Sequence, residues 1–232
     1  MSDWETISEE ASIVLVGNMN PKIFHPEWFI RKEIVEEWDY TNDEVINLPD
    51  LSQIELPNSR KVLATLNQFS VRSSQASEHL FLKDFINHTF SFLSEMPIRQ
   101  IGMNYISVIK IPDIDKWKQF SQLLAPQKYW SDAVGYIDDL EADKQEHMGL
   151  WELIMNLPRP NDNLEGYVRP KIAALPQAGK QVLAFSINNH VEIEHSNVNG
   201  ISEILDEHWD KSLTLAQQIT SNIMTTHLEI PQ

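Results

Sequence analysis

The stretch IRQIGMNYISVIKI, residues 98–111, decides the fold. In an extended chain, successive side chains point to opposite faces. One face of this stretch would carry five apolar side chains, namely those of Ile101, Met103, Tyr105, Ile109 and Ile111. The other face would still carry Ile106 and Val108. Because apolar side chains occupy both faces, we predict a strand at the centre of a β-sheet.

The residues that precede this strand predict three more strands and two helices. We expect the strands at residues 12–17, 45–56 and 62–71, the second of them at an edge because Pro49 interrupts it. The first helix should begin at Pro26 and run towards Trp38. The second helix should bury one face, formed by Leu82, Phe85, Ile86, Thr89, Phe90 and Leu93. Residues 12–112 thus have the βαββαβ order of a ferredoxin-like unit, which an acidic leader at residues 1–11 precedes.

The remaining residues, 113–232, predict a half of the order αβββα. A helix at residues 113–124 comes first, and the polar segment 130–146 after it should be a mobile loop. Turn residues then separate the strands of an antiparallel meander, at residues 149–157, 166–175 and 181–193. The long C-terminal helix has one apolar stripe, formed by Ile201, Ile204, Leu205, Trp209, Ser212, Ala216, Ile219 and Ile223. We expect it to pack on the sheet, so that both halves share one core in an α+β fold.

The composition limits the classes of protein to consider. The chain has 232 residues and no cysteine, which excludes thiol nucleophiles, disulfides and cysteine-ligated metals. No apolar run approaches the ~18 residues of a membrane helix. The acidic beginning of the chain is also unlike a signal peptide. We therefore expect a cytoplasmic protein without membrane association.

The negative charge lies at the two ends of the chain. Residues 1–57 hold 13 acids and 3 bases, residues 192–232 hold 7 acids and 1 base, and the residues between them hold 14 of each. A field of this sign repels phosphate backbones, which disfavours nucleic-acid binding in a basic groove. It would attract a protein with a basic surface, above all where the two ends meet in space. Solubility alone also accounts for such a charge.

The sequence lacks the common catalytic and phosphate-binding motifs. The dinucleotide-binding and P-loop glycine patterns, GxSxG, HExxH and the EF-hand pattern are all missing. We therefore expect no cofactor and favour a non-enzymatic protein, which would be an acidic subunit, adaptor or neutralising partner in a bacterial cytoplasmic complex. The candidate contacts with its partner are Trp4, Trp28, Glu33, Glu36 and Glu37, together with the acidic C-terminal segment. Self-association is left open.

Two other functions remain as alternatives. His190, Glu192 and Glu194 alternate along one predicted strand, so their side chains would share a face. An imidazole with two carboxylates can bind a divalent metal or hold a water molecule for general-base catalysis, which would suit a metal-dependent hydrolase. The other alternative is a module that senses a small ligand in a pocket between the sheet and the last helix.

Five segments in order along the chain support a resemblance. They are VLVGN (14–18), NPKIFHPEWF (20–29), PIRQIGMN (97–104), APQKYW (125–130) and NNHVEI (188–193). These segments resemble a sporadically distributed family of bacterial proteins that has no established activity. The resemblance implies a bacterial source and a single architecture over most of the chain, and it implies no catalytic residue.

Overall fold

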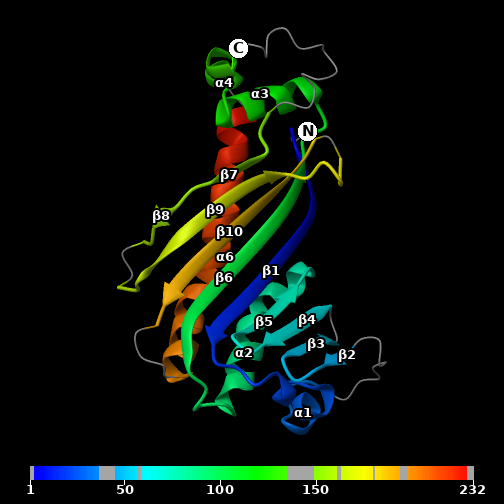
Figure 1. Cartoon of the computed structure of the whole chain (residues 1–232), viewed down its shortest axis with the longest axis vertical. Coiled ribbons are helices and arrows are strands. Elements are labelled where there is room, and N and C mark those ends of the chain that lie inside the picture. The colour runs from blue at the N-terminus through cyan, green and yellow to red at the C-terminus, as the bar shows by residue number, and fades with distance from the viewer. Residues whose placement is uncertain are drawn as a thin grey trace.

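The computed structural model shows an α+β protein whose described residues form one antiparallel sheet of ten strands (Figure 1). The structure describes residues 3–36, 45–56, 59–134, 149–160, 163–179, 181–193 and 198–228. Its long C-terminal helix runs behind the sheet in the view of Figure 1. None of the helices in these ranges is both long and apolar enough to cross a membrane.

The sheet joins both halves of the chain through the predicted central strand. Its strands are β1 (Glu5–Gly17), β2 (Val45–Asn47), β3 (Leu51–Leu56), β4 (Arg60–Thr65), β5 (Gln68–Ser73), β6 (Ile98–Lys110), β7 (Glu152–Ile154), β8 (Leu157–Pro158), β9 (Gly166–Ala174) and β10 (Val182–Glu192). Their order is β2-β3-β4-β5-β1-β6-β10-β9-β7, and β8 also pairs with β9. Strand β6 pairs with β1 on one edge and with β10 on the other, so its predicted central place is confirmed.

The helices come from both halves of the chain as well. They are the 3-10 helices η1 (Pro21–Ile23) and η3 (Ala76–Phe81) and the α-helices α1 (Pro26–Arg31), α2 (Leu82–Ser91), α3 (Ile114–Leu124), α4 (Gln127–Val134) and α6 (Val198–Leu228). Helix α2 buries the predicted face, except that Leu93 lies beyond its end. The predicted C-terminal helix is confirmed as α6, which contacts β6, β10, α2 and α3.

The first half departs from the predicted order of elements, and its ferredoxin-like character is not confirmed. Residues 62–71 form two strands, β4 and β5, because a turn at Leu66 and Asn67 reverses the chain. The turn is braced by a hydrogen bond from Thr65 Oγ1 to Asn67 Oδ1 at 2.9 Å. The supposed leader is wrong for residues 5–11, which belong to β1 and pair with β6.

The first helix also ends earlier than predicted. Helix α1 stops at Arg31, and Glu33 adopts a left-handed backbone with φ of 55°. The amide of Ile34 bonds the carbonyl oxygen of Phe29 at 3.0 Å, and that of Glu33 bonds the carbonyl of Ile30 at 2.9 Å. This pair of bonds is a Schellman motif, which closes a helix and redirects the chain. Val35 can therefore turn back into the core, where it is 8% exposed.

The second half follows the predicted order more closely. The meander is confirmed, because β7 pairs with β9 and β9 pairs with β10. The first helix of this half is confirmed as α3. The predicted loop 130–146 is wrong at its start, since Trp130 lies in α4. The rest of that loop, from residue 135 onwards, lies outside the described residues.

Both core clusters lie on the face of the sheet that carries the helices. The larger cluster joins β1, β5 and β6 to α1, α2 and α6, and its aromatic centre is Phe24, Phe29, Phe69, Phe85 and Phe90. The smaller cluster joins Ile109, Phe185, Phe120 of α3 and Met224 of α6. Ile106 and Val108 point to the opposite face and are only half-buried there. The described helices thus cover one face of β6, although its sequence is apolar on both.

Trp209 ties α6 to the rest of the core and provides a test of the fold. Its side chain is fully buried, and its indole Nε1 donates to the carbonyl oxygen of His79 at 2.8 Å. We expect Trp209→Ala to lower the free energy of unfolding by about 3–5 kcal/mol, because it leaves a large cavity. Urea denaturation followed by circular dichroism measures this change.

The matched control is Trp151→Ala, since the side chain of Trp151 is 72% exposed. That substitution should change the free energy of unfolding by no more than about 0.5 kcal/mol. Equal losses in the two variants would contradict the assignment of Trp209 to the core.

Candidate functional site

The two tryptophans predicted to meet a partner pack against the chain itself. The Trp28 ring meets Phe24 edge-on, with ring centroids 5.9 Å apart, and also meets Phe29 at 5.1 Å. Trp28 therefore fixes α1 to the larger core cluster. Trp4 packs against the smaller core cluster at the beginning of β1. Both side chains are half-buried, so each has a structural role in this fold.

The predicted acidic residues lie after the first helix and beside helix α2. Glu33 and Glu36 are exposed in the segment that follows α1, and Glu37 lies outside the described residues. The predicted helix from Pro26 towards Trp38 would have contained these acids, but α1 ends at Arg31. Residues of the same segment contact α2 and the residues that follow it. Lys32 Nζ lies 4.6 Å from the centre of the Phe92 ring, and Ile34 lines a cavity on this side of α2.

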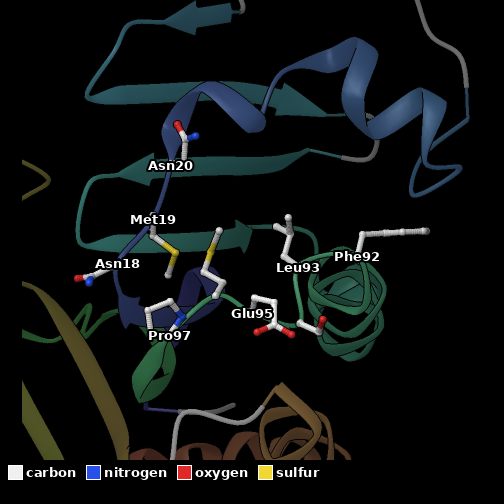
Figure 2. A pocket seen from close by; sticks show the side chains of 9 residues that line it. Asn18, Met19, Asn20, Phe92, Leu93, Glu95 and Pro97 are labelled. Carbon is white, nitrogen blue, oxygen red and sulfur yellow. The ribbon is translucent and has the colours of Figure 1, made fainter.

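Two cavities lie beside α2. The first, which we call the acidic cavity, has a volume of about 380 Å³ and is lined by Ile34, Arg60, Glu78, Phe81, Asp84, Phe85 and His88. The second, which we call the methionine cavity, has a volume of about 410 Å³ (Figure 2). Its apolar lining includes Met19, Leu93, Met96 and Pro97. In Figure 2 the Met19 side chain reaches into it, whereas the amide of Asn18 points away.

The lining of the acidic cavity has a net negative charge. Arg60 Nε lies 3.6 Å from Glu78 Oε2, and both side chains are only about 15% exposed. The guanidinium group of Arg60 also lies 5.9 Å from the centre of the Phe85 ring. Since Glu78 balances Arg60, the carboxylate of Asp84 gives the lining its net charge. His88 lies one helical turn from Asp84 on the exposed side of α2. Such a cavity favours a cation over an anion.

The acidic part of the C-terminal segment reaches α2 from its other side. Asp206 of α6 accepts a hydrogen bond from Asn87 Nδ2 at 3.1 Å and lies 3.8 Å from Lys83 Nζ. The first half of α6 also exposes Glu203, Glu207 and Asp210. The acidic segments from the two ends of the chain thus lie on either side of α2. We call α2, its two cavities and these flanking acids the α2 surface.

Side chains of the predicted metal-binding strand form a separate cluster, on the face of the sheet opposite to the helices. His190 Nε2 lies 2.8 Å from Glu192 Oε1, which also accepts a bond from Gln100 Nε2 at 3.2 Å. The hydrogen bond from His190 lowers the pKa of Glu192. The His190 ring stacks on the Tyr167 ring, with ring centroids 4.6 Å apart, and the guanidinium of Arg169 lies 4.2 Å from the centre of the Tyr167 ring. This cluster braces β6, β10 and β9.

The structure brings together two of the three predicted metal ligands. His190 and Glu192 share a face as predicted, and Glu194 lies outside the described residues. Within the residues that the structure describes, no three histidine, aspartate or glutamate side chains gather closely enough to hold a metal ion. The metal site therefore stays a prediction. Sequence reasoning missed Tyr167 and Gln100, which only the register of β9 and β6 places opposite His190 and Glu192.

A buried polar network lies between the sheet and α6. The hydroxyl of Tyr105 donates to the carboxylate of Glu9, and burial together with this bond raises the pKa of Tyr105. His79 Nε2 donates to the carbonyl oxygen of Ser73 at 3.1 Å. Burial lowers the pKa of His79, a residue that is only 5% exposed. This network was missed because Glu9 was assigned to the leader.

No protein-family model matches the chain, and a comparison with curated protein sequences finds no significant match.

The lowered pKa of His79 predicts how stability depends on pH. In the unfolded chain the histidine takes up a proton as the pH falls below its ordinary pKa of 6.5, whereas in the folded chain it stays neutral to lower pH. The free energy of unfolding should therefore fall as the pH decreases from 6.5, by at most about 1.4 kcal/mol per pH unit from this group. At pH 8 the residue contributes no pH dependence.

Urea denaturation between pH 5 and 8 measures this effect in the wild type and in His79→Asn. The variant should lose part of the slope below pH 6.5. His88→Asn, which changes an exposed histidine of α2, controls for the substitution itself. Identical slopes in the wild type and in His79→Asn would refute the assignment.

Proposed function

We propose that the chain is a non-enzymatic interaction protein, an acidic subunit or adaptor that binds a basic protein in a bacterial cytoplasmic complex through its α2 surface. One observation carries this proposal. Acidic segments from the two ends of the chain flank the same helix, next to a cavity of about 380 Å³ with a net negative lining. A net charge of −16 on the whole chain adds long-range attraction for a basic partner.

The bases of the α2 surface are already engaged within the chain. Lys83 lies beside Asp206, and Arg60 lies beside Glu78. The ammonium group of Lys32 lies over the Phe92 ring. These contacts leave the acids Glu33, Glu36 and Asp84 exposed. Lysine or arginine side chains of a partner would compensate that charge, and a cation in the acidic cavity would lie next to Asp84.

The exposed apolar side chains of this surface favour a protein partner over a free small cation. Leu80, Phe81 and Phe92 are 53%, 57% and 44% exposed, and they lie on η3 or at the end of α2. Protein interfaces bury aromatic anchors of this kind inside a polar and charged rim. The methionine cavity beside Phe92 offers a site for an apolar anchor of the partner, since methionine side chains adapt to different shapes.

A second candidate function is a metal-dependent hydrolase at His190, Glu192 and Glu194. The contact between His190 and Glu192 favours it, because an imidazole and a carboxylate at 2.8 Å form an acid–base pair. Against it, His190 is 9% exposed and has Tyr167 stacked on its ring. Metal analysis of the purified protein and thermal unfolding with added zinc or manganese distinguish this function. Bound metal that Glu192→Gln removes would favour it.

Charge reversal on α2 tests the proposed partner binding. We expect Asp84→Lys to weaken the binding of a stoichiometric basic partner about tenfold, which corresponds to about 1.4 kcal/mol. Affinity purification from the native host identifies the partner, and calorimetry with the isolated partner measures its Kd. The wild-type Kd should also rise with salt, since exposed charges are screened.

The matched control is Asp132→Lys, which reverses an exposed aspartate on α4 and changes the net charge by the same amount. The control should bind as the wild type does. The proposal fails if no stoichiometric partner is recovered, or if both variants lose the same affinity, because the effect would then come from net charge alone.

A further inference from the structure

The face of the sheet opposite to the helices has properties that the proposed function does not use. We call it the open face. Strand register defines it: it contains the even-numbered positions of β6 from Gln100 to Lys110, those of β10, and the side chains opposite them on neighbouring strands. The core clusters use the other positions, such as Ile101, Met103 and Phe185. Figure 1 is seen from the open face, with α6 behind the sheet.

The central strands of the open face carry apolar and small side chains among polar ones such as Asn104 and Asn188. Ile106 and Val108 of β6 lie opposite Ser186 and Ala184 of β10, and Val14 and Val16 of β1 lie opposite Gly102 and Gln100 of β6. The four branched side chains of Ile106, Val108, Val14 and Val16 are half-buried. Small side chains occupy several other positions, namely Ser12, Ser70, Ala173, Ala184 and Ser186. Two sheets that stack face to face lie about 10 Å apart, which requires short side chains at the contact. The small side chains of the open face meet this requirement.

The open face is also electrically neutral in a strongly negative chain. In the ten described strands its charged positions are five acids and five bases, namely Glu5, Glu10, Glu55, Glu152, Glu192, Lys61, Arg72, Lys110, Arg169 and Lys171. Cross-strand ion pairs join several of them. Lys61 lies 2.6 Å from Glu55, Lys171 lies 2.5 Å from Glu152, and Arg72 lies 3.5 Å from Glu10. The charge of −16 therefore comes from other parts of the chain.

We infer that the open face binds a second copy of this chain, so that two sheets form the layers of a sandwich. Two molecules of charge −16 repel each other, and contact through the neutral open face adds no further repulsion at the interface. Six neighbouring strands, about 4.8 Å apart and about 25 Å long, give a face on the order of 700 Å². A stable interface buries about 800 Å² on each partner.

A dimer of this kind accounts for the sequence of β6. This strand carries the apolar Ile106 and Val108 on the open face, which the described helices do not cover. The second copy would cover Ile106 and Val108. The same arrangement leaves both α2 surfaces on the outside of the dimer, because α2 packs on the opposite face of the sheet. The inference is therefore independent of the proposed partner binding, and either can fail alone.

The oligomeric state of the purified full chain provides the first test. Sedimentation equilibrium at about 100 µM should yield twice the chain mass of 26.8 kDa. This concentration is well above a micromolar Kd, which is the weakest that we expect for an interface of this size. Ile106→Glu should raise the dimer Kd at least 100-fold, because it buries an unpaired charge, on the order of several kcal/mol. Ile114→Glu, on α3 and 48% exposed, is the matched control and should stay dimeric.

Engineered cysteines give a second test that does not depend on the folding of Ile106→Glu. The chain has no cysteine, so a single one can form a disulfide only between two molecules. Ser12→Cys, Ser70→Cys and Ser186→Cys scan the open face with a nearly isosteric change. After mild oxidation at least one of them should form covalent dimers several-fold faster than Ser221→Cys, which is exposed on α6.

Four results would overturn the inference. The first is a monomer at about 100 µM, where even a weak dimer of this size would be populated. The second is a dimer that Ile106→Glu leaves intact, and the third is faster cross-linking through Ser221→Cys than through every open-face cysteine. A stoichiometric foreign protein that competes away the cross-link would likewise assign the open face to another occupant.

Discussion

Strand β6 pairs with β1 along one edge and with β10 along the other, over almost the whole length of all three strands. These two ladders are what join the halves of the chain, because the first half contributes β1 and the second contributes β10. Helix α6 packs against β6 and β10 and reaches α2 of the first half. Without the continuous ladder, the two core clusters would lose the sheet surface against which both of them pack. Every other feature depends on this central triplet of strands.

The two faces of the sheet differ in whether helices cover them and in their charge. One carries the described helices, both core clusters and the α2 surface, with acidic segments from the two ends of the chain. The other carries equal numbers of acids and bases in the described strands, several of which form cross-strand pairs. A negatively charged helical side suits a basic partner, whereas a neutral sheet face suits a second copy. The division follows from the alternation of side chains along each strand.

Local periodicity made the longest elements predictable. The apolar stripe of α6, the buried face of α2 and the two-sided apolar pattern of β6 are all visible in the sequence. The hairpin between β4 and β5 was missed because the apolar Leu66, which is 58% exposed, continues a strand-like run through the turn. The acidic cavity could not be predicted, since Arg60, Glu78 and Asp84 come from separate elements whose meeting depends on tertiary packing. Only the spacing of Asp84 and His88 was a local signal.

We propose that this protein acts through the charge of its helical side. Hydrogen–deuterium exchange of the full chain, measured with and without its isolated partner, tests the claim directly, because amide protection maps a contact along the backbone. The account predicts slower exchange in α2, in the segment that follows α1 and in the first half of α6, with the change weakened at high salt. Protection confined to β6, β10 and β9, and unaffected by salt, would contradict it.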